Sequence, residues 1–235
     1  MSFLISVFVN EGIVLASDRR ITYTDTQIIN GNLVKRIGIH NNNSTDKTFI
    51  CPNGAGISVC GNATLLNKPI TGFILDMIRT KISETCEIED IPQIIINYFN
   101  ALEEIPDTDF IVAGYDIKYK KRQLIYKLNV QTKKVENIDT TLQGATWQGE
   151  TSTFTRLIKN VALKIEDGTY EDLPVENILF EFFTLQDAVD FARYAVETTI
   201  QTMRFKNVVE TVGGDVDILV ITPNETKWLQ KKNLF

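Results

Sequence analysis

The chain has 235 residues, of which 43% are hydrophobic and 23% charged, and its formal net charge is −6. A chain with this apolar content can bury a large core without stabilisation by a disulfide or a metal ion. We expect one domain over residues 1–235. The basic residues are scattered and the pI is near 5.0, which argues against a nucleic-acid partner. No signal-like segment and no apolar run of about 18 residues occurs, which argues against secretion and a membrane partner.

Cysteine and histidine usage argues against redox and metal chemistry. Cys51, Cys60 and Cys86 form no C-x-x-C pair and are odd in number, so we interpret them as reduced thiols in a cytoplasmic protein. The one histidine, His40, and the unpaired cysteines do not supply a tetrahedral ligand set. We therefore expect no metal and no cofactor.

The chain opens with two short apolar segments. Residues 3–9 and 13–17 are β-branched and apolar on both faces, which is typical of strands covered on two sides, and Gly12 lies at the turn between them. Residues 22–46 are polar and rich in asparagine. That stretch predicts an extended hairpin or a mobile loop.

Helical spacing follows. Apolar residues from Leu66 to Ile78 recur at intervals of three and four, with Pro69 near the helix start, and a second helix is predicted after Pro92. Strand patterns return over residues 109–117 and 122–130. The basic KYKKR sequence between them predicts a solvated hairpin tip.

The last third contains a second pair of predicted helices. They cover about residues 151–165 and 185–204, and Thr184 opens the second with a capping-box signature. The order is strands, helix pair, strands, helix pair and strand. One-sided helices must cover apolar sheets, so we predict an α+β fold, a four-layer αββα sandwich.

Ser2 is the first candidate for chemistry. If Met1 is removed, Ser2 carries a hydroxyl nucleophile and an α-amine general base on one residue. The ordinary pKa of such an amine, roughly 7.7 to 8.0, suits a base near neutral pH. A Ser-His-Asp triad is disfavoured because His40, the single histidine, lies in a polar stretch.

The stretch from Ser2 to Arg20 resembles the opening of proteasome-type β subunits and their bacterial relatives, which are N-terminal nucleophile hydrolases. Their nucleophile, hairpin glycine and Asp-x-Arg fall on Ser2, Gly12 and residues 18–20 at matching spacing. The family's catalytic lysine and oxyanion glycine stand fourteen residues apart, as Lys47 and Gly61 do. A rival alignment on Lys35 makes that distance far too long.

Two later segments extend the resemblance. ETVGGDVDILVIT is similar to the family's last helix-to-strand passage, which contains a Gly-Gly pair. QGATWQGE is similar to the Gly-x-Ser-x-x-Gly segment of the related Anbu group, with Thr146 in the serine position. The resemblance thus reaches both ends of the chain and implies the αββα fold.

The resemblance also implies roles for individual residues. Ser2 would attack a carbonyl, Asp18 would orient Lys47, and the Gly61 N–H would donate to the oxyanion. The backbones of Thr22 and Ala63 would pair with an extended peptide substrate, and Thr146 would complete the substrate-binding set. These assignments describe a peptidase acting on amide bonds.

Departures from the family pattern leave alternatives open. Ser2 replaces the usual threonine, and the family residues that support the terminal amine fall on Val209 and Val212. A catalytically inactive scaffold or binding subunit is therefore one alternative, and an amidase acting on a small amide is another. The resemblance implies self-association as a ring or a helical homo-oligomer, and the sequence identifies no unfoldase partner.

Overall fold

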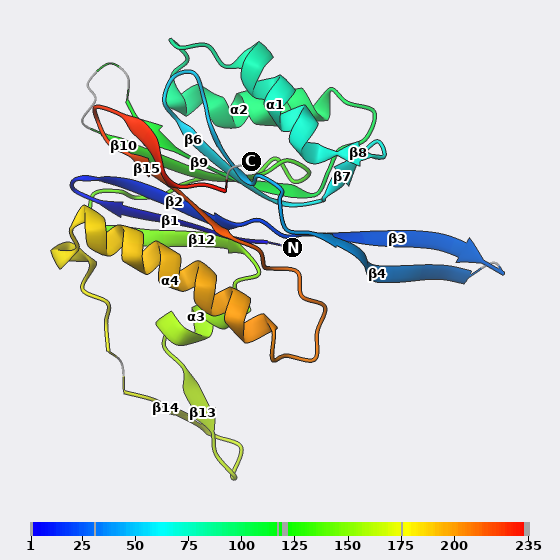
Figure 1. Cartoon of the computed structure of the whole chain (residues 1–235). Helices are drawn as coiled ribbons and strands as arrows, with labels where there is room; N and C mark the ends of the chain where they lie inside the picture. Colours follow the sequence, from blue (N-terminus) through cyan, green and yellow to red (C-terminus); the bar gives the residue numbers. More distant parts are fainter. Residues whose placement is uncertain (1, 31, 117, 119–121, 175, 233–235) are drawn as a thin grey trace.

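The computed structural model describes residues 2–30, 32–116, 118, 122–174 and 176–232, with the backbone alone at 24–29, 33, 35–37 and 39 (Figure 1). The described part is a mixed α/β structure with two five-stranded sheets, three two-stranded hairpins and four α-helices. All strand pairs in it are antiparallel. Met1 and the centre of the predicted KYKKR tip lie outside the described residues.

The first sheet contains both ends of the described chain. Its strands, in spatial order, are β12 (Gly144–Gly149), β1 (Phe3–Val9), β2 (Gly12–Asp18), β15 (Val216–Ile221) and β16 (Thr226–Gln230). β1 and β2 form the predicted opening hairpin. Every residue of both strands is buried, as their apolar faces require.

The second sheet is formed by the middle of the chain. Its strands, in spatial order, are β11 (Val135–Asn137), β10 (Gln123–Asn129), β9 (Thr108–Tyr115), β6 (Gly56–Gly61) and β5 (Thr48–Ile50). β9 and β10 are the predicted strands of residues 109–117 and 122–130. β5 and β6 lead from Lys47 to Gly61, so this hairpin brings the two positions to one end of the sheet.

Helices cover the outer face of each sheet (Figure 1). α1 (Ile70–Lys81) and α2 (Ile91–Asn100) share an apolar cluster with the second sheet. α3 (Ser152–Ile158) and α4 (Leu185–Met203) share another with the first sheet, where Phe154 contacts Phe3. The predicted Thr184 capping box at the start of α4 is present.

A third apolar cluster joins the inner faces of the two sheets. Leu4, Phe8 and Leu15 of the first sheet pack there with Ile111 and Ile125 of the second. Phe3, Ile5 and Val7 of β1 point to the helices instead. Because successive side chains of a strand point to opposite faces, β1 contributes alternate residues to two apolar clusters.

Three hairpins lie outside the two sheets. β3 (Ile21–Ile29) and β4 (Asn32–Asn42) form the long one, which the sequence predicted as a hairpin or a loop. β7 (Thr64–Leu65) and β8 (Lys68–Pro69) form a short one before α1. β13 (Ala162–Lys164) and β14 (Tyr170–Asp172) form the third, which projects beyond α3.

The helix predicted over about residues 151–165 is wrong beyond Ile158. Residues 162–164 form β13 because Val161, Leu163 and Ile165 alternate with smaller or polar residues at the strand period of two. β16 was also missed, since its sequence TKWLQ is short and mostly polar. Within the described residues, no helix is both long enough and apolar enough to cross a bilayer.

Two glycines test the packing between the sheets. A Cβ on Gly56 would lie 2.6 Å from Leu15 Cδ1 and 2.9 Å from Ile221 Cδ1, whereas a Cβ on Gly72 of α1 meets nothing within 4 Å. We expect Gly56→Ala to lower the free energy of unfolding by about 1–3 kcal/mol through overpacking. Gly72→Ala should instead raise it by about 0.5–1 kcal/mol through helix propensity.

Urea unfolding of both variants at one protein concentration checks this expectation. A Gly56→Ala protein as stable as Gly72→Ala would contradict the close approach of the two sheets at this position.

Candidate active site

The structure brings five of the predicted site residues to one cavity of about 890 Å³. Its lining includes Ser2, Thr22, Lys47, Gly61 and Ala63. These residues come from the start of β1, from β3, and from the two ends of the β5–β6 hairpin. Asp18, the sixth residue to be placed, is fully buried at the end of β2 and contacts Lys47.

The Asp18 carboxylate is the centre of the hydrogen bonding here. Its Oδ1 accepts from the Lys47 ammonium at 2.8 Å and from the Phe3 N–H at 3.1 Å. Its Oδ2 accepts from the Arg20 N–H at 3.0 Å and the Gly213 N–H at 2.9 Å. One carboxylate therefore fixes the lysine, the start of β1 behind Ser2, and the passage into β15.

Asp18–Lys47 is the middle rung of three side-chain contacts between two segments, which we call the polar ladder. Ser17 Oγ lies 2.9 Å from Thr48 Oγ1, and Arg19 Nη2 lies 2.7 Å from Asp46 Oδ1. Residues 17–19 thus contact residues 46–48 in antiparallel order. Since β2 and β5 belong to different sheets, the polar ladder joins the sheets beside the cavity.

Arg19 anchors the ladder in the first sheet. Its guanidinium is 1% exposed and bonds Asp217 Oδ2 of β15 at 2.7 Å and the Ser44 carbonyl oxygen at 3.0 Å. Burial raises the pKa of Asp217, and the Arg19 charge opposes that shift. Lys231 reaches Asp46 at 3.3 Å, so the end of the described chain joins the same cluster.

Burial lowers the pKa of Lys47, although contact with the Asp18 carboxylate acts in the opposite direction. Desolvation disfavours the ammonium, and an opposite charge favours it. A lysine with a lowered pKa gives up its proton more readily than an exposed lysine does. Such a group can exchange protons with a neighbouring hydroxyl or amine.

Backbone contacts with the end of β12 position Ser2. The Glu150 N–H donates to the Ser2 carbonyl oxygen at 2.7 Å, and a Cβ on Gly149 would lie 1.8 Å from that oxygen. Gly149 also has a φ of +88°, in the left-handed region that favours glycine. Only glycine fits there.

Gly61 has a comparable constraint. Its φ is +125°, and a Cβ there would lie 2.5 Å from the Asp107 carbonyl oxygen. A side chain at this position would push β6 from β9 and reshape the cavity wall. The close approach explains why a glycine ends β6.

Thr146 does not reach this cavity. It lies on β12 opposite Ser6, whereas the residues near Ser2 are Gly149 and Glu150. Thr146 is absent from the described cavity lining. The structure thus separates Thr146 from the other site residues.

The two valines in place of amine-supporting residues lie in different surroundings. Val212 is 1% exposed and packs in the apolar cluster with Phe3, whereas Val209 is 40% exposed. Neither side chain offers a hydrogen bond. Glu210, between them, forms an ion pair with Arg20.

Sequence reasoning missed several polar residues of the cavity wall. Tyr23 and His40, whose rings lie 5.7 Å apart, come from the root of the β3–β4 hairpin. Asn62, Glu104 and Asp107 also line the cavity. No motif joins these positions, so only the fold reveals that they share a surface. Among the described residues, no group of three or more potential metal ligands occurs.

Comparisons with solved structures identify proteins of similar fold. No protein-family model and no curated protein matches the chain. A solved structure of an Anbu (Gly-1) mutant from Hyphomicrobium sp. strain MC1 aligns with a TM-score of 0.60 at 11% identity, covering 100% of this chain and 87% of its own.

Two further solved structures have a fold similar to that of this chain. Anbu from Hyphomicrobium sp. strain MC1 aligns with a TM-score of 0.57 at 12% identity, and Anbu (ancestral beta-subunit) from Yersinia bercovieri with 0.56 at 11%. Each covers 98% of this chain and 88% of its own. The resemblance to Anbu proteins is thus confirmed at the level of the fold.

Buried Asp217 provides a test of the cluster at Arg19. We expect Asp217→Asn to lower the free energy of unfolding by about 3–5 kcal/mol, because it leaves the guanidinium without its buried partner. Asp190→Asn is the matched control, since Asp190 pairs with Arg193 on the surface of α4. That change should cost at most about 0.5 kcal/mol. Equal effects in urea unfolding would contradict the role given to Arg19.

Cys60, which lines the cavity, provides a second test. Burial raises the pKa of its thiol to about 12, so at pH 8 it holds almost no thiolate. We expect iodoacetamide to label Cys86, which is half-buried, faster than Cys60 in the native protein. In denaturant the two rates should converge. Peptide mass spectrometry measures both, and faster native labelling of Cys60 would contradict this account.

Proposed function

We propose that this protein is an N-terminal nucleophile hydrolase that cleaves amide bonds in peptides with Ser2, after removal of Met1. The observation that carries the proposal is the shared Asp18 oxygen, which holds the Lys47 ammonium at 2.8 Å and the first amide of β1 at 3.1 Å. The same carboxylate oxygen therefore fixes both Lys47 and the start of β1. The Anbu-like fold supports the same conclusion.

The architecture that we propose for this function is a single four-layer αββα sandwich over residues 1–235. Three apolar clusters support it: one between the sheets and one between each sheet and its pair of helices. In this arrangement the polar ladder crosses the middle of the sandwich beside the cavity. Buried, unpaired Cys51 and Cys60 are consistent with a reducing cytoplasm as the place of action.

The reaction follows from the groups around the cavity. Ser2 Oγ attacks the substrate carbonyl and gives its proton to the Ser2 amine, which passes it to the leaving amine as the amide bond breaks. Lys47 stabilises the deprotonating hydroxyl by its charge, and Asp18 holds Lys47 in place. The Gly61 N–H donates to the oxyanion, an interaction worth about 3–4 kcal/mol. Water then hydrolyses the ester on Ser2 and restores the free hydroxyl.

Substrate binding in this proposal uses the cavity walls on both sides of Ser2. Thr22 on β3 and Ala63 after β6 line the cavity, and each would pair its backbone with an extended peptide as an added strand does. Thr146, which the resemblance assigns to substrate binding, is not among the cavity-lining residues, and Gly149 and Glu150 hold Ser2 through its carbonyl oxygen. The active form is a homo-oligomer, a ring or a helical assembly.

A catalytically inactive scaffold subunit is the second candidate. The observation that favours it is Val212, which packs with Phe3 in the apolar cluster where the family pattern has a polar residue supporting the amine. Without that support the amine is held by fewer hydrogen bonds. A scaffold would keep the fold and the polar ladder and would lack turnover.

Substitution of the two central residues separates these candidates. We expect Ser2→Ala to lower the hydrolysis of a fluorogenic peptide pool by a factor on the order of 10³ or more, because the nucleophile is lost. Lys47→Ala should have nearly the same effect. Ser83→Ala, on an exposed serine between α1 and α2, is the control and should keep full activity.

Far-UV circular dichroism confirms that each variant is folded. Activity that persists in folded Ser2→Ala would eliminate the hydrolase mechanism, and a wild-type chain inert toward the whole pool would favour the scaffold.

A further inference from the structure

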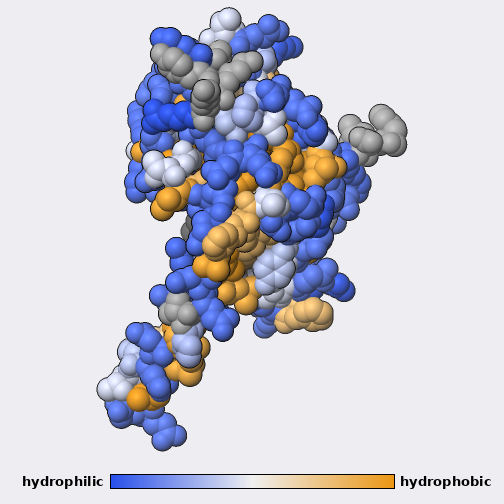
Figure 2. All heavy atoms as spheres, turned by 90° about the vertical axis from the view of Figure 1, so that its left-hand side faces the viewer, coloured by the Kyte–Doolittle hydropathy of each residue, from blue (hydrophilic) through white to orange (hydrophobic). Residues whose placement is uncertain are grey.

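The segment around the β13–β14 hairpin stands away from the rest of the molecule. Every residue from 159 to 174 is exposed, and β13 and β14 pair only with each other. Figure 2 shows the hairpin as a separate protrusion on which hydrophobic and hydrophilic side chains adjoin. An isolated two-stranded hairpin is at best marginally stable in water. This segment, residues 161–173 and here called the acidic arm, therefore requires a partner surface.

Strand alternation gives the acidic arm one apolar face. Val161, Leu163 and Ile165 alternate along the first strand, and the Leu173 N–H donates to the Val161 carbonyl oxygen at 3.0 Å. Cross-strand neighbours share a face, so Leu173 joins the other three side chains, and Glu171, the partner of Leu163, places one carboxylate among them. Each of the four is 37% to 54% exposed. An uncovered apolar face of this kind marks an interaction site.

The charge of the acidic arm restricts its partner. Four carboxylates and one ammonium give it a net charge of −3; they belong to Glu166, Asp167, Glu171, Asp172 and Lys164. Two such arms placed face to face would repel each other. The arm is matched instead by a surface that is both apolar and basic.

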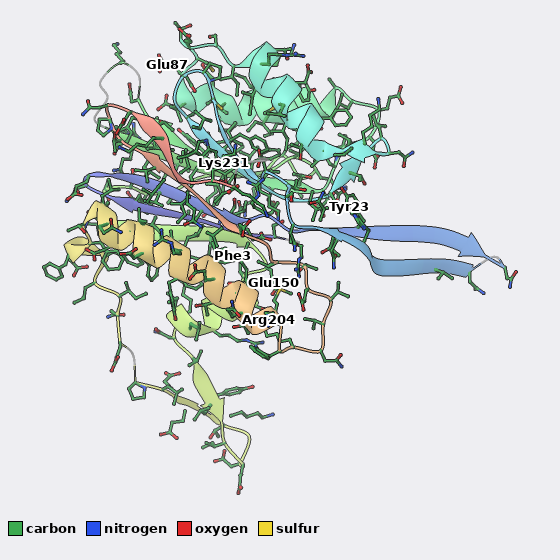
Figure 3. All side chains as sticks on the ribbon, in the orientation of Figure 1. Phe3, Tyr23, Glu87, Glu150, Arg204 and Lys231 are labelled. Carbon is green, nitrogen blue, oxygen red and sulfur yellow. The ribbon has the colours of Figure 1, made fainter. Side chains whose placement is uncertain are left out.

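This chain carries a surface of that kind at the turn after α4. Phe205 is 83% exposed and Val208 is 55% exposed. Arg204, labelled in Figure 3, and Lys206 supply two positive charges. Arg204 bonds only Gln201, and Lys206 bonds Thr153, among the hydrogen bonds of the described residues. Neither cation has a carboxylate partner in that part of the chain.

We propose that the acidic arm of one copy docks on the turn at residues 204–208 of a second copy. The apolar face of the arm covers Phe205 and Val208, and arm carboxylates pair with Arg204 and Lys206. The contact joins two different surfaces, so it is heterologous and propagates into a ring or a filament. This inference rests on the self-association proposed above and is independent of hydrolysis.

Sedimentation velocity of the full chain over a concentration series tests the arm. We expect the wild type to sediment with an apparent mass above the 26.6 kDa of one chain. Leu163→Glu should raise the dissociation constant at least about tenfold, because it places a charge in the apolar face. Ala162→Glu is the matched control: it adds the same charge on the opposite face of the same strand and should leave assembly unchanged.

Charge reversal tests the receiving surface. Arg204→Glu should weaken assembly, and combining it with Glu171→Arg should restore assembly, since the paired charges are exchanged. Circular dichroism checks folding, which these exposed positions should not disturb. Assembly that is equally strong in Leu163→Glu and wild type would overturn the docking proposal and leave self-association intact. A wild type that stays monomeric at every concentration would overturn both.

Discussion

The polar ladder between residues 17–19 and 46–48 is the constraint on which the candidate site depends. It places three side-chain pairs in antiparallel order across the gap between two sheets, and its central pair is Asp18–Lys47. Charged groups are stable in such a place only when they are paired and hydrogen-bonded. Arg19 contacts Asp46 and Asp217 together, and Lys231 also pairs with Asp46, so two positive and two negative charges lie together.

This balance leaves Lys47 with a specific chemical character. Its neighbour Asp18 accepts four hydrogen bonds, three of them from the backbone amides of Phe3, Arg20 and Gly213, so its position is fixed by the main chain. Burial lowers the pKa of Lys47 while the ladder holds its ammonium in one direction. A preorganised charge beside an N-terminal hydroxyl stabilises a developing oxyanion without reorganisation. The ladder therefore connects the fold to the proposed reaction.

The sequence predicted the parts of the structure that local patterns determine. The β1–β2 hairpin, α1, α2 and the cap of α4 follow from periodicity and capping chemistry, and the spacing of Lys47 and Gly61 places both on the cavity. It did not predict that Arg19 pairs with Asp46 and Asp217, because both partners lie far from Arg19 in the sequence and no local pattern joins them. Thr146 was assigned by motif, and the register of β12 on β1 moves it opposite Ser6. β13 was predicted as helix, since its short apolar run fits both periods.

The central claim is that Ser2 becomes a free N-terminus beside the Asp18–Lys47 pair. Intact mass and N-terminal sequencing of the purified native protein test it most directly. The account predicts a chain that begins at Ser2, with hydroxyl and amine both available. A chain that retains Met1 quantitatively would block the amine and contradict the nucleophile assignment.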